Sequence, residues 1–236
     1  MANTLEAMPK PESWAFKMKY FPSAPLLASA LLFGCTASEE PLAQSNPQDE
    51  FWAALSSHCG NAFEGGLVSE DETDADMAEA EMLIHVRTCD EGQITVPFHI
   101  KGPDGAWNRS RTWVFTRIGE GDEAGIRLKH DHRHEDGTSD DVTMYGGDTA
   151  DQGTARRQSF PVDQESIDMF QREGLDASIT NVWSVEVDPA GGTGDNARYA
   201  YQLTRKQELG APEDRNFRVE FDLTNAVEAP PAPWGF

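Results

Sequence analysis

Hydrophobic and polar residues alternate along most of the chain, and the alternation has a period of two. This period is typical of a β-strand that buries one face. It predicts strands over residues 81–89, 93–101, 110–118, 126–134, 142–145, 181–188, 197–205 and 216–224. Residues 61–68 and 156–161 are two weaker candidates.

Two segments fit a helix instead. Asn46 followed by Pro47 is typical of a helix start, and the hydrophobic positions of residues 47–58 then share one helical face. Asp163 can cap a second short helix that runs up to Gly174. The helices are too few to cover a sheet, so the strands must form the core.

Many short strands with few helices indicate an all-β domain. We expect a single antiparallel up-and-down barrel-like domain, of calycin type, over residues 48–227. The alternative is a β-sandwich. We favour the barrel because closure hides the strand edges and can enclose one small ligand. A proline-rich tail, residues 228–236, follows the predicted domain.

The segment 126–134 holds three of the six histidines. In an extended chain one face of this segment carries Ile126, Leu128, His130, His132 and His134. A face that begins apolar and ends rich in imidazole indicates a core that opens into a polar cavity. We predict a small-molecule cavity lined by Arg111, Trp113, His130, His132 and Tyr145.

The same histidines suggest a metal site, with zinc as the first candidate. Side chains two apart on a strand lie about 6.6 Å apart, so neighbouring histidines of the run could share an ion. His130 and His134 would be about 13 Å apart, so a further ligand is required. The candidate ligands are His130, His132, His134, Glu135 and Asp136, with His85 or His99 as outside donors. Alternatively, the histidines and arginines of this run pair with its aspartates.

Arg109 and Arg111 precede Trp113 on one predicted strand. A guanidinium beside a stacking ring can bind a carboxylate or a phosphate. The alternative is that both arginines pair with carboxylates of the protein itself.

The chain is strongly acidic, with 19 lysines and arginines against 41 aspartates and glutamates and a net charge of −22. Such a charge repels phosphate backbones and excludes nucleic acid as a partner. The acidic residues 69–81 predict a solvated loop. The sequence contains no Gly-x-Ser-x-Gly elbow and no dinucleotide-binding glycine pattern, so it leaves an enzymatic activity uncertain.

Residues 18–35 combine a positive start at Lys19, a short apolar run and Gly34 before Cys35. This segment resembles a bacterial lipoprotein signal peptide, which implies that Cys35 carries a lipid anchor to a membrane of the cell envelope. Lipoprotein signal peptides usually have a small residue immediately before this glycine, whereas this chain has the bulky Phe33. Ordinary secretion with cleavage nearby is therefore the alternative. We predict that the protein starts at Met18 and that residues 1–17 are an extension outside the signal. Residues 36–47 are predicted to form a disordered tether.

Cys59 and Cys89 are the two cysteines beyond this signal. In an exported protein we expect them to form a disulfide, and a reactive thiol or a metal ligand is the alternative.

The motifs SRTWV, LKHDHRHEDG, TMYGG, SFP, NVW and RVEFDLT together resemble those of uncharacterised bacterial secreted proteins. No activity follows from this resemblance. Three hypotheses remain: a small-molecule or metal-binding barrel module, a metal-dependent hydrolase that uses the His130 and His132 strand, and a structural envelope protein without a ligand.

Overall fold

The structure is a computed structural model that describes residues 46–192 and 196–236. These residues belong to the compact unit Ala43–Phe236. The predicted signal, the lipidation site Cys35 and nearly all of the tether lie outside the described residues. No helix within the described ranges is long and apolar enough to cross a membrane.

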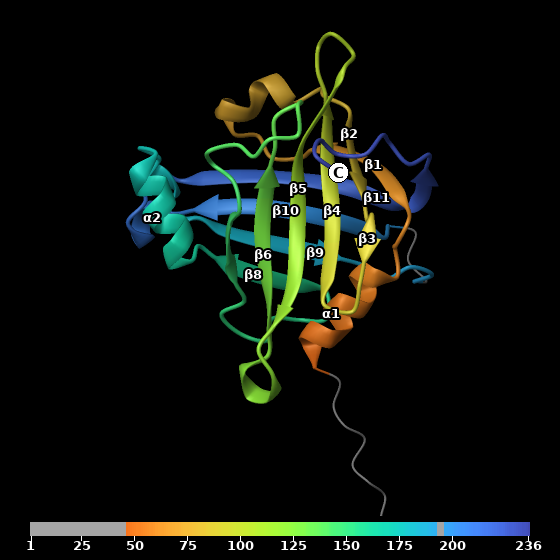
Figure 1. Cartoon of the computed structure of the whole chain (residues 1–236), viewed down its shortest axis with the longest axis horizontal. Helices are drawn as coiled ribbons and strands as arrows, with labels where there is room; N and C mark the ends of the chain where they lie inside the picture. Colours follow the sequence, from red (N-terminus) through yellow and green to blue (C-terminus); the bar gives the residue numbers. More distant parts are fainter. Residues whose placement is uncertain (1–45, 193–195) are drawn as a thin grey trace, which may run out of the picture. The chain divides into compact units, whose positions relative to one another are not determined.

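Antiparallel strands dominate the fold and wind around a common core (Figure 1). The strands are β1 (Ala62–Leu67), β2 (Met82–His85), β3 (Thr88–Cys89), β4 (Gln93–Lys101), β5 (Trp107–Ile118), β6 (Gly125–His132), β7 (Tyr145–Asp148), β8 (Arg157–Pro161), β9 (Val182–Val187), β10 (Arg198–Arg205) and β11 (Arg215–Val227). Their order in the sheet is β7-β6-β5-β4-β2-β1-β11-β10-β9-β8, with β3 paired to β4. If the short β3 is left aside, strands that follow one another in the chain also pair in the sheet. The exception is the seam between β7 and β8, which do not pair. The predicted all-β, up-and-down barrel is therefore confirmed as a nearly closed barrel.

The seam lies between β7 and β8. One backbone hydrogen bond crosses it, from the N–H of Asp163 to the carbonyl oxygen of Gly146 at 2.9 Å. A Cβ atom at Gly147 would overlap the carbonyl oxygen of Pro161, so only glycine permits this approach. The predicted strand over residues 142–145 was wrong in its bounds, because β7 begins at Tyr145 and these two glycines lie inside it, at the closure of the barrel.

Two α-helices flank the barrel at different places (Figure 1). Helix α1 (Pro47–Ser56) begins at Asn46, whose Oδ1 accepts a hydrogen bond from the N–H of Gln48 at 2.9 Å. Its buried Phe51 packs against Phe115 of the core. Helix α2 (Gln164–Arg172) is capped by Asp163, as expected. The short 3₁₀ helices are η1 (Glu72–Met77), η2 (Gly121–Glu123), η3 (Asp176–Thr180) and η4 (Gln207–Leu209).

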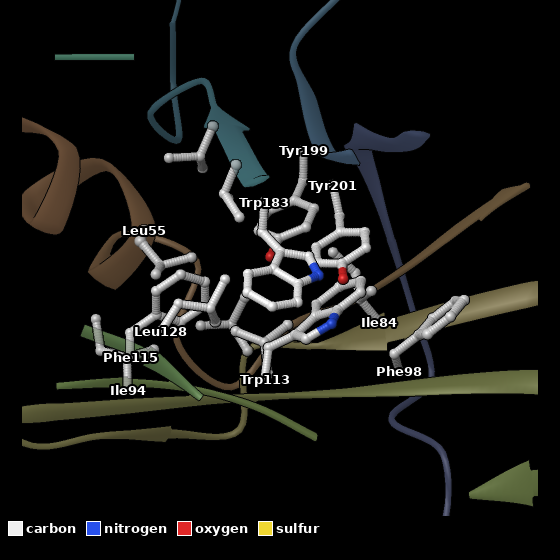
Figure 2. Close-up of a cluster of buried hydrophobic side chains, with 14 of the residues drawn as sticks. Leu55, Ile84, Ile94, Phe98, Trp113, Phe115, Leu128, Trp183, Tyr199 and Tyr201 are labelled. Atoms are coloured by element: carbon white, nitrogen blue, oxygen red, sulfur yellow. The ribbon is translucent and has the colours of Figure 1, made fainter. Parts of the chain in front are cut away.

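The inward side chains of the strands form one aromatic-rich core (Figure 2). Trp113 lies at its centre and stacks on Phe98, Tyr199 and Tyr201, with ring centroids 5.0, 5.7 and 4.4 Å away. Such stacked aromatic pairs stabilise a core by more than their buried area alone. All four side chains belong to the buried core cluster.

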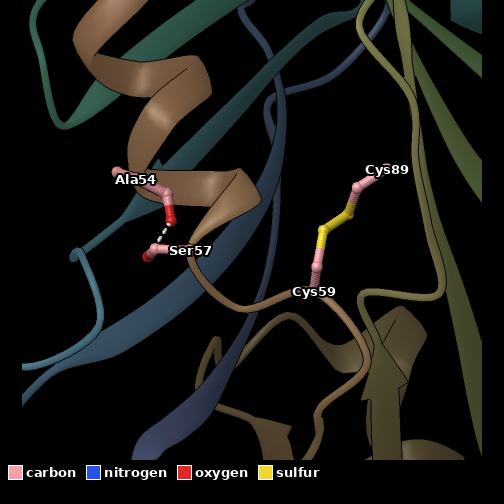
Figure 3. Close-up of a disulfide and its surroundings, with 4 residues drawn as sticks. All are labelled: Ala54, Ser57, Cys59 and Cys89. Carbon is pink, nitrogen blue, oxygen red and sulfur yellow. Dashed lines mark hydrogen bonds between the residues drawn. A yellow bond between two sulfur atoms is a disulfide. The ribbon is translucent and has the colours of Figure 1, made fainter. Parts of the chain in front are cut away.

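Cys59 and Cys89 form the expected disulfide, which confirms that prediction (Figure 3). The bond joins the chain just after α1 to the short strand β3, and it closes a loop with a sequence separation of 30 residues. It therefore ties the helix at one end of the barrel to the sheet.

Candidate functional site

A cavity of about 270 Å³ opens where β4 and β10 end and where β5 and β11 begin. This is the end of the barrel opposite to α1 (Figure 1). Its apolar lining consists of Met77, Phe98, Ile100, Trp113, Leu203 and Phe217. Its polar lining consists of Asp74, Arg111, His130, His132, Tyr145, Tyr201 and Arg215.

The structure brings all five predicted ligand-binding residues to this one cavity. Strand register explains why they meet, since Arg111 lies opposite His132, Trp113 opposite His130, and His130 opposite Tyr145. Residues opposite one another on adjacent strands share a face of the sheet. Three neighbouring strands thus form one wall of the cavity.

His130 is held by two hydrogen bonds that fix its tautomer. Its Nδ1 lies 3.0 Å from the carbonyl oxygen of Tyr145, and its Nε2 lies 2.8 Å from the hydroxyl of Tyr201. A carbonyl can only accept, so Nδ1 carries the proton and Nε2 accepts from Tyr201. Burial lowers the pKa of His130 to about 3, and the ring is therefore neutral at pH 7.

His132 and Tyr145 form a second polar pair, with His132 Nε2 3.2 Å from the Tyr145 hydroxyl. Burial, followed by the positive charge of Arg111, lowers the pKa of His132 to about 4. Burial raises the pKa of Tyr145 to about 12. Both side chains are uncharged at neutral pH, so the formal charges in the cavity wall belong to Asp74 and the two arginines.

Asp74 and Arg215 are cavity residues that the sequence did not assign to the site. Arg215 Nη2 lies 2.5 Å from Asp74 Oδ1, and its Nη1 lies 2.8 Å from Asp71 Oδ2. Asp74 is only 3% exposed, so the prediction of a solvated loop over residues 69–81 was wrong at this position. Its partner is 141 residues away, and no local pattern could have indicated the pair.

Arg111 is the cavity arginine without an ion pair. Its Nη1 lies 3.2 Å from Ser110 Oγ, and within the described ranges no carboxylate oxygen lies within 4.0 Å of its guanidinium. Arg109 has a different environment, because its Nη1 donates to the carbonyl oxygen of Ala232 in the C-terminal tail at 2.5 Å. The β4–β5 pairing shifts register between Phe98 and Ile100, opposite Arg109. This irregularity separates the two arginines, which we had expected to act together.

The expected metal ligands lie in two separate places: His130 and His132 line the cavity, and the other three lie in the turn that follows β6. Strand β6 ends at His132, and not at residue 134 as predicted, so His134, Glu135 and Asp136 are exposed in the following turn. In the part of the chain that the structure describes, no three His, Cys, Asp or Glu side chains gather in a way that could hold a metal ion. The zinc hypothesis thus gains no support from this geometry.

No protein-family model matches the chain, and neither a curated protein nor a solved structure matches it. The residues of the cavity are therefore the basis for assigning a function.

Proposed function

We propose that this protein is an exported, lipid-anchored β-barrel module of the bacterial cell envelope that binds a small molecule. The observation that carries the proposal is the cavity itself, which combines an aromatic floor with a few convergent polar groups. This composition is typical of small-molecule sites, which are mostly apolar, largely preformed and oriented by few polar side chains.

The size of the cavity limits the ligand. Its volume of about 270 Å³ lies just below the range of about 300–1,000 Å³ that is typical of ligand pockets. A small organic molecule of one ring or a short chain fits this space, and a long lipid or an oligosaccharide does not.

Ligand binding is tested by filling the cavity. Leu203 lines it, and Leu203→Trp should occupy the space that a ligand needs. Leu209→Trp is the matched control, because Leu209 is 68% exposed and lies outside the cavity. The probes are a phenylpropyl series with one carbon skeleton and three head groups: neutral 3-phenylpropan-1-ol, anionic 3-phenylpropionate and cationic 3-phenylpropylamine.

Isothermal titration calorimetry of the purified protein measures the outcome. We expect at least one member of the series to bind to the wild-type protein. Leu203→Trp should weaken this binding by about tenfold or more, which corresponds to about 1.4 kcal/mol. Leu209→Trp should leave the binding unchanged. Melting temperatures verify that both variants fold. Binding that survives Leu203→Trp, or no binding by any of the three probes, would contradict the proposal.

The exported location rests on the signal-like residues 18–35 and is supported by the disulfide, since disulfides persist in oxidising compartments. Cys35→Ala should move the protein from the membrane fraction to the soluble fraction of an exporting bacterium. Immunoblots of the two fractions measure this change, with Cys35→Ser as a second variant. Unchanged membrane association of both variants would argue against lipidation.

A further inference from the structure

Arg111 has hydrogen-bonding capacity that the protein does not use. A guanidinium offers five N–H donors in a planar fork, and among the described residues this side chain donates one hydrogen bond, to Ser110 Oγ. Asp140 lies close enough to His132 and Tyr145 to affect their pKa values. Its Oδ1 nevertheless accepts from the N–H of Val142 at 2.8 Å, and it forms no ion pair with Arg111. In a chain with 41 acidic and 19 basic residues, an arginine in a cavity wall without a carboxylate partner is unexpected.

The other charged groups of the cavity are already paired. Asp74 is bound in a fork by both terminal nitrogens of Arg215, at 2.5 and 2.7 Å, and Arg215 also holds Asp71. A cationic ligand would therefore find no free carboxylate in the lining. An anionic ligand would find the guanidinium of Arg111.

The groups beside Arg111 provide the rest of a binding site. Trp113 follows two residues later on the same face of β5, with Phe98 stacked on it. The Trp113 ring also stacks on Tyr201 (Figure 2). Trp113 and Phe98 are only 2% and 3% exposed, so an apolar body contacts only those parts of the two rings that line the cavity. Leu203 and Phe217 complete this apolar surface, while a charged head reaches the arginine. A single arginine fork matches the two oxygens of one carboxylate.

We propose that the cavity selects a small organic acid whose carboxylate binds Arg111 and whose apolar body packs on Trp113. This inference rests on the proposed function above, because it names the class of ligand for the same cavity. The ligand is defined by its chemistry: one carboxylate joined to a ring or a short chain.

The test compares the phenylpropyl series on the wild-type protein, Arg111→Gln and Arg109→Gln. Hydrogen bonds to a charged group contribute about 1.5–3 kcal/mol, so the wild-type protein should bind 3-phenylpropionate about 10- to 150-fold more tightly than 3-phenylpropan-1-ol. Arg111→Gln should remove this preference by weakening the binding of 3-phenylpropionate. Arg109→Gln is the matched control and should keep the preference, because Arg109 binds the tail and does not line the cavity.

Arg111→Lys provides a second variant that keeps the charge and loses the planar fork, and it should retain part of the preference. Melting temperatures identify a variant that fails to fold. If the alcohol or the amine binds the wild-type protein as tightly as the acid, and Leu203→Trp still blocks binding, the acid inference is wrong and the proposed function stands. If none of the three probes binds, the proposed function itself is wrong.

Discussion

Acidification below pH 6.5 is expected to destabilise the barrel steeply, because two buried histidines, His130 and His99, and the half-buried His132 remain neutral in the native state. Burial lowers the pKa of His130 to about 3 and that of His132 and His99 to about 4. The unfolded chain binds a proton at each of them near pH 6.5, whereas the native state does not. The stabilisation that these neutral histidines provide is thus fully present above pH 6.5 and is lost as the pH falls towards 4.

The size of this effect depends on how steeply the free energy of unfolding changes with pH. Each histidine contributes about 1.4 kcal/mol per pH unit while only the unfolded chain binds its proton, and three together contribute about 4 kcal/mol per pH unit. Between pH 6.5 and pH 4 the loss adds up to at most about 10 kcal/mol, so a domain in the lower half of the ordinary range of about 5–15 kcal/mol should unfold before pH 4. Urea titrations followed by tryptophan fluorescence at a series of pH values measure the slope.

His130→Asn tests whether His130 contributes to this pH dependence. The asparagine amide can still donate a hydrogen bond to the carbonyl oxygen of Tyr145, so this contact of the ring is kept. This variant should reduce the slope by about 1.4 kcal/mol per pH unit. The matched control is His134→Asn, in the exposed turn, which should keep the slope of the wild-type protein. Equal slopes for the wild-type protein and His130→Asn would disprove the role of His130.

Loss of the disulfide is the second change with a large expected effect. The double variant Cys59→Ser, Cys89→Ser should lower the free energy of unfolding by about 3 kcal/mol, because a cross-link over 30 residues restricts the unfolded chain. Urea unfolding at pH 7 measures the difference. A reducing agent should destabilise the wild-type protein by a similar amount and leave the double variant unchanged. A wild-type protein that is insensitive to reduction would contradict the structural role of this bond.

The local pattern of the sequence predicted the barrel wall well. Arg111, Trp113, His130 and Tyr145 follow an alternation that depends only on the extended backbone, and regular antiparallel pairing then places them side by side. A period-two pattern therefore contains the information for one wall of the cavity.

The errors arose where distant contacts decide the structure. Asp74 is buried because Arg215 comes from the far end of the chain, and Gly147 is extended because β8 approaches it across the seam. His134 leaves the strand because the chain turns after His132. Arg133 contributes to that turn by contacting Asp131 and the carbonyl oxygen of Gly137. The partners of Asp74 and Gly147 cannot be identified from the neighbouring residues, whereas the turn after His132 rests on local contacts that the alternating pattern does not reveal.

The most direct test of the central claim, that the cavity binds a small ligand, is a crystal structure of the protein with 3-phenylpropionate. We expect the carboxylate about 3 Å from the guanidinium nitrogens of Arg111 and the phenyl ring inside the cavity, in contact with Trp113 and Leu203. Density for the probe only on the outside of the barrel, with water alone in the cavity, would contradict the claim.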